Sequence, residues 1–567
     1  MSIHETLTLE TVEDRVLRQL CEALIFEGLC SVRNVGTELE WTLTKTNFRS
    51  QLDIGGFDRP RIHPGSITVQ IDDLWHPAKL DDVLNVLPAD AELRSELRDD
   101  LSRTAFLTNL TRPIVQQRGS RIAMTYDQLE CAIDEGHPYH PCFKARSGFS
   151  DADHLAFGPE AAETFQLEWL AVDKGLIAQM VPDGFWRKEL GERNRLKLCR
   201  QATAAGINLS EFGLIPAHPW QTKALQTDPI YRAWIETRKV VPLGPVGDRY
   251  RATQSVRTLA NVDDPTRAHV KTSMAMRNTS SLRTIEPHSV CIAAAISNWL
   301  AKVVDSDPLF ETDLRFTILP EYAGIIAARE TPLAGHLAVL YRQSPQGCGL
   351  ASDQIMPFNA LSLLEADGQP FIHPWVQKHG LRHWLDQLLR VTILPIWHLM
   401  VAHGIGLEAH AQNLMLEHDD GWPIGLVARD FHESLEYVPE LLSQPELVPD
   451  LAAVDPIYSG ARAGAFHLMP SAEALRELVM DTLFIYNLAE LASLLHRHYA
   501  VPEPLFWKKV RGILDEHVAQ HGLQARQDLF APFTPQIFTE SLMTLKLNGG
   551  EGVFQHSVSN PLNLPKG

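Results

Sequence analysis

Two His-Pro pairs within one short segment constrain the conformation of this chain most strongly. Residues 136–149 read GHPYHPCFKARSGF. Each proline fixes its own φ and biases the preceding histidine toward an extended conformation, so this segment is too rich in proline to be a helix. Gly148 permits a turn or the close approach of another molecule. The sequence therefore predicts a stiff, open loop that carries His137, His140 and Lys144.

Helix-like and strand-like patterns alternate along the rest of the chain. Helical periodicity covers residues 11–32, 80–110, 120–134, 163–206, 380–403, 471–498 and 503–520. Strand-like runs lie near 40–48 and 66–71, and short strands with Gly/Pro turns fill the region before about 345. A chain of 567 residues also exceeds what one hydrophobic core usually supports. We therefore expect a mixed α/β (α+β) protein of several parts.

The charge balance narrows the class of partners. At a net charge of −19 the chain repels a phosphate backbone, and no basic run offsets this, so we expect no nucleic-acid partner. The most apolar stretch, residues 388–407, is interrupted by Arg390, Pro395, His398 and His403, which argues against a membrane span. The amino terminus lacks the basic start and apolar run of a signal peptide, so a cytoplasmic location is expected.

Two features are expected to be structural rather than catalytic. The seven cysteines are odd in number and form no CxxC pair, which indicates reduced thiols, and Cys142 in the His-Pro loop is expected to pack between its apolar neighbours. The HPWQ segment at residues 218–221 is expected to be a buried tryptophan beside a hydrogen-bonded histidine.

Residues 406–433 form a second informative stretch, GLEAHAQNLMLEHDDGWPIGLVARDFHE. Alternation predicts that Glu408, His410 and Gln412 share one face of a strand, and HDDG predicts a hairpin turn. A turn at the two aspartates of HDDG places His410 opposite Asp430. Carboxylates and an amide at one end of such a ribbon suit Mg²⁺. The alternative is a surface hairpin whose polar residues face solvent.

Hydroxyl and cationic side chains gather between residues 251 and 284, a stretch without glycine and therefore without a P-loop. They are Ser255, Arg257, Thr258, Lys271, Thr279 and Arg283. Arginine binds phosphate and carboxylate oxygens bidentately, and lysine adds a point charge. In an acidic chain this set predicts an anion site. The alternative is a solvated strand pair with ordinary surface cations.

Five segments, in this order, resemble the signature of one enzyme family. They are GHPYHPCFKARSGFS, HPWQ, SVRTL with K…TSSLRT, LEAHAQN, and RDFHE. The set is similar to that of the siderophore synthetases that act independently of nonribosomal peptide synthetases, the aerobactin synthetase (IucA/IucC-type) family. The likeness spans about residues 130–435, and the remaining helical tail resembles the family's carboxy-terminal part.

The resemblance implies an ATP-dependent, AMP-forming ligase. Such an enzyme adenylates a carboxylate of citrate or of a citrate-derived monoamide, releases pyrophosphate, and passes the acyl group to an amine, hydroxylamine or alcohol. The nucleophile expected is therefore a polyamine, a hydroxylamine or an amino alcohol. The unbroken His-Pro loop followed by AFGPE at 156–160 is more similar to members that take a monosubstituted citrate.

The resemblance also assigns roles by position in the motifs. The implied ATP contacts are His137, His140, Lys144, Ser255, Arg257, Thr258, Lys271, Glu408, Gln412, Asn413 and Asp430. The implied Mg²⁺ ligands are Glu408, Asn413 and Asp430, and the implied citrate contacts are Thr279, Arg283 and His410. The candidate catalytic residues are Lys271, Arg283 and His410. Whether His410 only binds citrate or takes a proton from the nucleophile stays open.

The implied architecture is a cupped hand that forms a homodimer. It has a mostly helical thumb at 1–165, mixed α/β fingers at 166–375, and a palm at 376–567 with the hairpin and carboxy-terminal helices. One departure concerns the tail, where the family often has an MRL-like segment and this chain reads MTLKL. The role of Lys546 is therefore left open.

Two other classes of function remain to be weighed. EAHAQN followed by RDF superficially resembles the catalytic loop of a kinase. A kinase, however, needs an aspartate base before the asparagine and a Gly-rich loop, and neither is found here. A non-catalytic protein that binds citrate or a ferric siderophore is the third class, and it leaves the oxygen set of Glu408, Asn413 and Asp430 unexplained.

Overall fold

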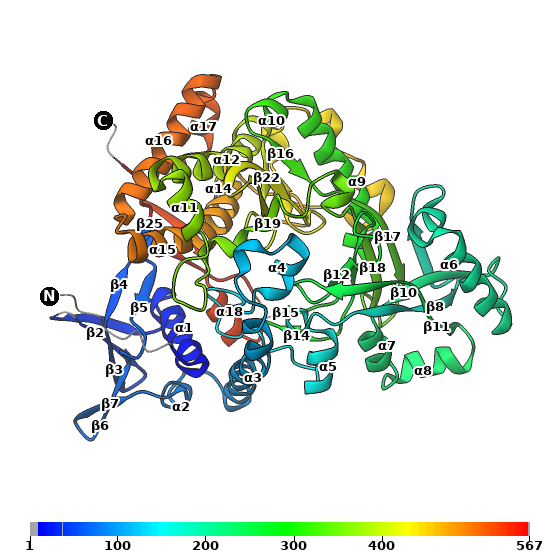
Figure 1. Ribbon diagram of the computed structural model, residues 1–567, viewed down its shortest axis with the longest axis horizontal. Helices are drawn as coiled ribbons and strands as arrows, with labels where there is room; N and C mark the ends of the chain where they lie inside the picture. Colours follow the sequence, from blue (N-terminus) through cyan, green and yellow to red (C-terminus); the bar gives the residue numbers. More distant parts are fainter. Residues whose placement is uncertain (1–9, 37, 280, 551, 565–567) are drawn as a thin grey trace.

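The largest sheet has eight antiparallel strands and occupies the middle of the chain (Figure 1). The structure is a computed structural model that describes residues 10–36, 38–279, 281–550 and 552–564. In spatial order the strands are β10 (Phe212–Ala217), β8 (Phe165–Asp173), β11 (Val240–Ala252), β12 (Thr258–Asn261), β13 (His269–Thr272), β18 (Leu337–Arg342), β17 (Glu321–Ala327) and β9 (Ile177–Met180). Because β13 and β18 are neighbours, Lys271 lies opposite Leu340, two residues from Arg342 at the end of β18.

The helix expected over 163–206 is wrong in its first half. Strands β8 and β9 occupy 165–180, and only α6 (Phe185–Ala204) is helical. The run FQLEWLAVD in β8 is short and apolar, and such a run fits a buried strand or a buried helix segment equally well by periodicity. Pairing with β10 on one edge and β11 on the other decides the outcome.

A smaller four-stranded sheet carries the expected hairpin. Its order is β16 (Phe316–Ile318), β22 (Trp422–Ala428), β21 (Leu414–Asp419) and β19 (Ile355–Pro357), with β16 and β22 parallel. The turn lies at Asp420 and Gly421, which have φ values of 47° and 80°. Two positive φ values suit a tight hairpin turn between twisted strands. The hairpin predicted from HDDG is confirmed, with its turn one residue beyond the predicted centre at the two aspartates.

The amino-terminal part contains a sheet as well as helices. Helices α1 (Val12–Phe26), α2 (Leu80–Leu84), α3 (Ala91–Gln116) and α4 (Tyr126–Ala132) accompany a five-stranded sheet. Its strands are β1 (Ser31–Val35), β2 (Glu38–Leu43), β3 (Thr46–Ser50), β6 (Thr68–Ile71) and β7 (Leu74–Pro77), with the pair β4 (Leu52–Ile54) and β5 (Pro60–Ile62) beside it. The expected strands near 40–48 and 66–71 are present, but the sheet is larger than that pattern indicated.

The carboxy-terminal part is helical, as expected. It contains α12 (Leu381–His403), α14 (Ala472–Val479), a π-helix (Met480–Leu488), α15 (Ala489–Tyr499), α16 (Glu503–His521), α17 (Gln524–Phe530) and α18 (Leu542–Leu547). Two described helical stretches, Leu381–His403 and Ala472–Tyr499, are long and apolar enough to cross a membrane by length and composition. In the most apolar 18 residues of each stretch, 78% and 89% are buried inside the protein, which is what core helices show.

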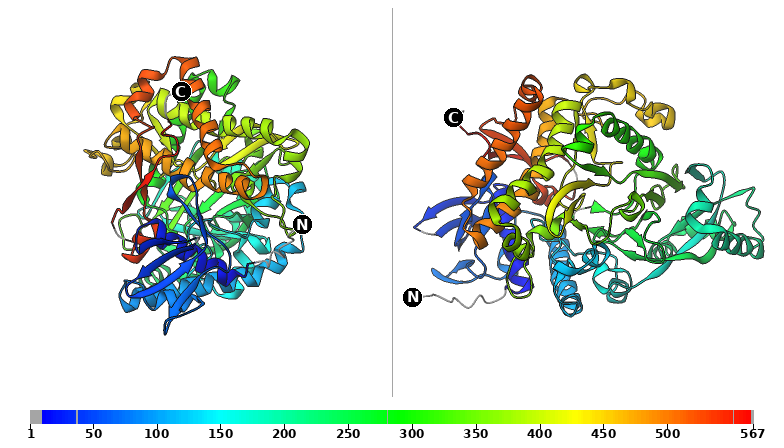
Figure 2. Two further views of the ribbon diagram at one scale, coloured as in Figure 1. Left: turned by 90° about the vertical axis from the view of Figure 1, so that its left-hand side faces the viewer. Right: turned by 45° about the horizontal axis from the view of Figure 1, so that its top comes forward.

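The two ends of the chain pack together. Figures 1 and 2 show the amino-terminal strands (blue) beside the carboxy-terminal helices (orange), with the eight-stranded sheet extending away from them. One hydrophobic core includes side chains from both ends of the chain, whereas most of the eight-stranded sheet packs on a core of its own. Arg59 and Arg61 bind Glu490 across the junction at 2.9 and 2.8 Å. The exact thumb, fingers and palm boundaries stay a prediction of the sequence.

Candidate active site

Lys271 and Arg342 meet Asp430 at the junction of the two main sheets. Lys271 Nζ lies 3.4 Å from Asp430 Oδ1, and Arg342 Nη1 lies 2.8 Å from the same oxygen. Asp430 follows β22 and has a φ of 64°, a left-handed conformation that turns the chain there. Burial would raise the pKa of Asp430, but Arg342 and Lys271 hold it well below its usual value. The carboxylate is therefore charged at neutral pH.

A second layer of side chains holds this cluster. His432 Nε2 lies 3.3 Å from Lys271 Nζ, and His432 Nδ1 lies 2.6 Å from Glu321 Oε1. Glu321 also accepts the backbone N–H groups of Phe431 and His432. Glu321, His432 and Arg342 were not among the site residues predicted from the sequence. RDFHE contained the histidine, but Glu321 and Arg342 lie on β17 and β18, and only the sheet brings them together.

The EAHAQN segment departs from the strand that the sequence predicted. The ladder ends at Leu414, and Glu408–Asn413 forms a loop closed by a bond from Asn413 N to His410 O at 2.9 Å. Arg429 donates its backbone N–H to the carbonyl oxygen of Asn413 and its Nε–H to the carbonyl oxygen of Gln412. The backbone of Gln412 and Asn413, rather than that of His410, therefore lies beside Arg429. The predicted pairing of His410 with Asp430 is wrong because the chain leaves the ladder before it.

Polar groups still converge at this end of the hairpin. His410 Nε2 lies 3.5 Å from Glu408 Oε1. Burial, with the nearby charge of Glu433, raises the pKa of Glu408 to about 7, and burial lowers the pKa of His410 to about 4. At neutral pH His410 is a neutral imidazole, which can accept a proton.

A buried ion pair ties this hairpin to the amino-terminal part. Arg429 Nη1 lies 2.9 Å from Glu130 Oε1 and 2.7 Å from the hydroxyl oxygen of Tyr126, both on α4. Glu130 also accepts the backbone N–H of Gln254, which follows β11. The pair therefore joins α4, the hairpin and the segment before Ser255.

The expected anion-binding residues line two neighbouring segments. Ser255 Oγ accepts the backbone N–H of Thr258 and is exposed, while Arg257 donates to the carbonyl oxygen of Thr284. Burial lowers the pKa of Arg257, and the charges of Glu433 and Asp430 act against that shift, so Arg257 lies near the Asp430 cluster. The site therefore includes a third cation besides Lys271 and Arg342.

The expected citrate contacts lie in the next segment. Arg283 Nη2 donates to Thr279 Oγ1 at 2.8 Å. Burial, with the nearby charge of Arg257, lowers the pKa of Arg283 to about 10. Lys546 Nζ lies 3.3 Å from the carbonyl oxygen of Thr279 and 2.5 Å from Asp100 Oδ2. The departure at MTLKL thus places a lysine beside the expected citrate contacts.

The His-Pro loop is mostly buried, whereas the sequence predicted an open loop. His137 Nδ1 accepts the backbone N–H groups of Tyr139 and His140, and burial lowers the pKa of His137 to about 4. His410 and Arg283 lie close enough to influence that pKa. Among the described residues, the buried Nε2 of His140 has no hydrogen-bond partner. A buried polar atom of this kind is one that a bound ligand can satisfy.

Lys144, on the same loop, is not brought to this cluster. Its Nζ lies 3.1 Å from Glu160 Oε1, and both side chains are buried. A nucleotide contact through Lys144 would require this pair to rearrange. Cys142 is fully buried with its pKa raised to about 12 by burial, which fits packing. In HPWQ, His218 Nδ1 caps α7 (Pro219–Leu225) by accepting the N–H of Trp220, as a structural role requires.

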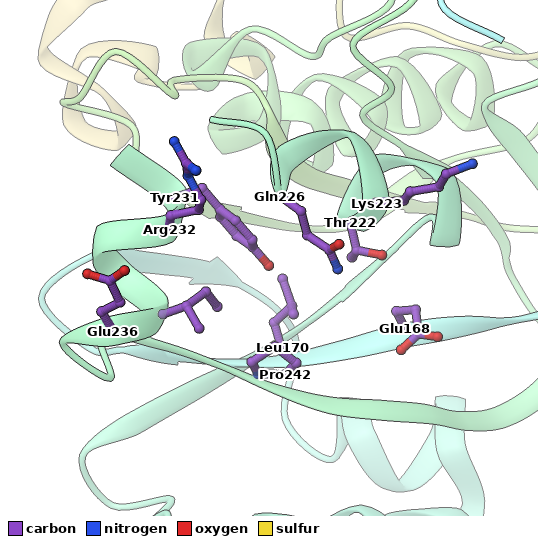
Figure 3. A pocket seen from close by; sticks show the side chains of 10 residues that line it. Glu168, Leu170, Thr222, Lys223, Gln226, Tyr231, Arg232, Glu236 and Pro242 are labelled. Carbon is purple, nitrogen blue, oxygen red and sulfur yellow. The ribbon is translucent and has the colours of Figure 1, made fainter. Parts of the chain in front are cut away.

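A pocket of about 450 Å³ lies elsewhere, on the eight-stranded sheet (Figure 3). Glu168 and Leu170 on β8 face Gln226 and Tyr231 from the helices above them. None of the expected ATP, citrate or metal residues lines it. The pocket therefore does not belong to the candidate active site.

The residues of the candidate site fit ATP and Mg²⁺. Glu408 and Asp430 supply carboxylate oxygens and Asn413 an amide oxygen, which are ligands that Mg²⁺ accepts together with phosphate oxygens. Lys271, Arg342 and Arg257 supply fixed positive charge beside them. Cations and carboxylates gathered in this way indicate the class of protein: an enzyme that binds anionic substrates together with a metal ion.

Comparison with known proteins gives the family. The family model described as the IucA / IucC family matches residues 125–363. A citryl-spermidine/3,4-dihydroxybenzoyl-citryl-spermidine:spermidine ligase from Bacillus anthracis is 32% identical over 97% of this chain and 93% of its own length. The chain belongs to the IucA/IucC family of siderophore synthetases. It is an amide-forming ligase of siderophore biosynthesis.

Solved structures agree with the fold. The petrobactin biosynthesis protein AsbB from Bacillus anthracis is 31% identical, with a TM-score of 0.90 over 97% of this chain and 95% of its own. ATP-bound aerobactin synthetase IucA from Klebsiella pneumoniae shares the fold, with a TM-score of 0.77 and 17% identity over 98% of this chain and all of its own.

A second family model, described as a ferric iron reductase FhuF-like transporter, matches residues 382–552. That segment contains no cysteine, so it carries no thiolate-ligated redox centre.

Proposed function

We propose that this chain uses ATP and Mg²⁺ to adenylate a carboxylate of a monosubstituted citrate and then forms an amide with an amine. The observation that carries the proposal is the convergence of Lys271, Arg342 and Arg257 beside Asp430. Two anions, the nucleotide and the citrate-type carboxylate, must approach each other, and fixed cations offset their repulsion. Mg²⁺ would add further positive charge when bound between Glu408, Asn413 and Asp430.

The proposed reaction has two steps. A carboxylate oxygen bonds to the α-phosphorus of ATP, and pyrophosphate leaves. The amine nitrogen then bonds to the acyl carbon, loses a proton, and AMP leaves with the carboxylate oxygen. We assign the orientation of a non-reacting carboxylate to Thr279 and Arg283, and the acceptance of the amine proton to neutral His410. The ATP contacts assigned to the remaining expected residues stay proposals.

Two observations support an amine as the nucleophile. Burial raises the pKa values of Glu408, Glu436, Asp481 and Glu540, and the charge of Glu408 raises those of the other three further, so carboxyl groups that repel one another lie close together near His410. A cationic amine relieves that repulsion. The names of two relatives point the same way: one is a spermidine ligase acting on citryl-spermidine, and one from Staphylococcus aureus, 28% identical, makes a 2-aminoethylcarbamoyl product. The first name also supports a monosubstituted citrate as acyl donor.

The test is product analysis with purified protein, ATP and Mg²⁺. We expect AMP and pyrophosphate to form only when a carboxylate is present, faster with a citrate monoamide than with citrate, and hydroxylamine to trap the acyl group. ADP would indicate a kinase-like phosphotransferase. No turnover with either carboxylate and any amine would indicate a binding protein. Either result would overturn the proposal.

We further propose a homodimer, on the family resemblance, and a cytoplasmic location, because the named relatives are biosynthetic enzymes. Light scattering of the purified chain and fractionation of cells are the corresponding measurements.

A further inference from the structure

A buried cluster of histidines lies apart from the candidate active site. Asp307 Oδ2 lies 2.9 Å from His398 Nε2 and 3.0 Å from His403 Nε2. Asp307 follows α9 (Pro287–Ser306), and both histidines belong to α12. The three ligand atoms lie within 4.8 Å of one another. Three potential ligands from two segments thus point at one place.

Neighbouring groups fix the orientation of both rings. His398 Nδ1 lies 3.0 Å from Nε2 of His517 on α16, and His403 Nδ1 lies 2.9 Å from Ser443 Oγ. In metal sites the second ring nitrogen of each histidine ligand is held by such a partner. The two Nε2 atoms are thereby aimed at Asp307, which is the arrangement that a bound cation uses.

Each ring can keep its second hydrogen bond when a metal is bound. A metal on Nε2 leaves the ring proton on Nδ1, where Nε2 of His517 and Oγ of Ser443 can accept it.

We propose that Asp307, His398 and His403 form a binding site for one divalent transition-metal ion of the Zn²⁺ class. Imidazole nitrogens with one carboxylate suit Zn²⁺ and its neighbours, whereas Mg²⁺ prefers oxygen. Ligand atoms around tetrahedral Zn²⁺ are about 3.3 Å apart given Zn–N and Zn–O lengths near 2 Å, so the two separations from Asp307 Oδ2 need to open by only a few tenths of an ångström. The Asp307 side chain is 19% exposed, which leaves a path for the ion and for a water as fourth ligand.

The site would act as a clamp rather than as a catalyst. It joins the segment after α9 to the carboxy-terminal turn of α12, and His517 ties α16 to it. After His403 the chain passes through β20 (Ile405–Leu407) directly to Glu408. A metal here would fix the end of the helix from which the loop of the candidate active site starts. The inference does not depend on the reaction proposed above.

The test is metal binding by the untagged full-length chain after removal of metals with a chelator. Equilibrium dialysis against Zn²⁺, with Mg²⁺ in excess to occupy the oxygen-rich site, is followed by metal analysis. We expect one Zn²⁺ per chain, a Co²⁺ derivative with visible absorption, and loss of both in His398→Gln and His403→Gln. The matched control is His521→Gln, whose ring lies 4.6 Å from that of His517 but which makes no hydrogen bond to the three ligands among the described residues.

Two further variants keep the outcome decisive. If either histidine variant fails to fold, Asp307→Asn, which keeps the shape of the side chain, must also lose the ion. Ser443→Ala, which removes only a partner of His403, should weaken Zn²⁺ binding on the order of 10-fold. The proposal is overturned if the wild-type chain binds no Zn²⁺. It is equally overturned if the His398 and Asp307 variants retain the ion, because Zn²⁺ would then lie at another site, such as the group of Glu321, Asp430 and His432.

Discussion

Arg342 at the end of β18 lies 2.8 Å from Asp430 after β22, so a cation of the eight-stranded sheet and a carboxylate of the four-stranded sheet form one ion pair. The Arg342 side chain is 3% exposed and that of Asp430 20% exposed. Buried ion pairs are maintained only when further groups share the charge. Lys271 supplies that group here. The pair places the candidate active site at the junction of the two sheets.

Asp430→Asn should lower kcat on the order of 100-fold, because it removes a proposed metal ligand and leaves Lys271 and Arg342 without their shared carboxylate. The activity that remains should depend more weakly on Mg²⁺ concentration. Steady-state rates over a Mg²⁺ titration give both quantities. Asp419→Asn, the same change at the exposed turn of this hairpin, is the control. Unchanged Mg²⁺ dependence in Asp430→Asn would refute its role.

Arg283→Ala should raise the KM for the citrate-type substrate by roughly 10- to 100-fold, the effect of losing one hydrogen bond to a charged group. The KM for ATP should stay the same, because Arg283 is assigned to the carboxylate. Arg277→Ala is the matched control: this exposed neighbour pairs with Glu96 at the surface. Equal changes in both KM values would contradict the assignment.

Lys546→Met should destabilise the protein by about 3–5 kcal/mol, because it leaves the buried carboxylate of Asp100 without its partner. Adding Asp100→Asn should restore most of that stability. If Lys546 also supports the Thr279 loop, the double variant should still bind the citrate-type substrate more weakly than the wild type. Thermal unfolding and substrate KM separate the two roles. A double variant with wild-type KM would leave Lys546 a purely structural role.

Glu490→Gln should destabilise the junction between the two ends of the chain in a pH-dependent way. Burial would raise the pKa of Glu490, but Arg61 and Arg59 hold it at about 2, below its usual 4.5. Because the folded-state pKa is the lower one, the stabilisation is complete above about pH 5 and is lost as the pH falls toward 2. At pH 7 it amounts to about 3 kcal/mol by linkage.

Unfolding midpoints in urea at pH 7, 4 and 3 test this prediction. The gap between wild type and Glu490→Gln should narrow as the pH falls. Glu473→Gln, an exposed glutamate of α14, is the control and should show a small gap at every pH. A gap for Glu490→Gln that stays constant or widens in acid would contradict the assigned pKa.

Local sequence patterns were sufficient for features that depend on neighbouring residues. The long helices α12 and α16 and the turn of the hairpin follow from periodicity and turn residues. The cationic segment 251–284 and the EAHAQN segment were also recognised, because their chemistry is concentrated in short runs.

Features that depend on long-range pairing could not be predicted. β8 was mistaken for a helix because its partners β10 and β11 lie far along the chain. Arg342 and Glu321 were missed because each is a single charged residue at one end of a mostly apolar strand, and only strand order brings them to Asp430. The ion pair of Lys144 with Glu160 was not predicted either, because the sequence does not reveal that these two residues are neighbours.

The most direct test of the proposed reaction is the fate of one oxygen atom. The purified chain is incubated with ATP, Mg²⁺, an amine, and a citrate monoamide whose free carboxylates carry ¹⁸O, and the AMP is analysed by mass spectrometry. Adenylation predicts one ¹⁸O atom in each AMP formed. Unlabelled AMP, or ¹⁸O found in inorganic phosphate with ADP as the nucleotide product, would contradict an acyl-adenylate and the proposed function with it.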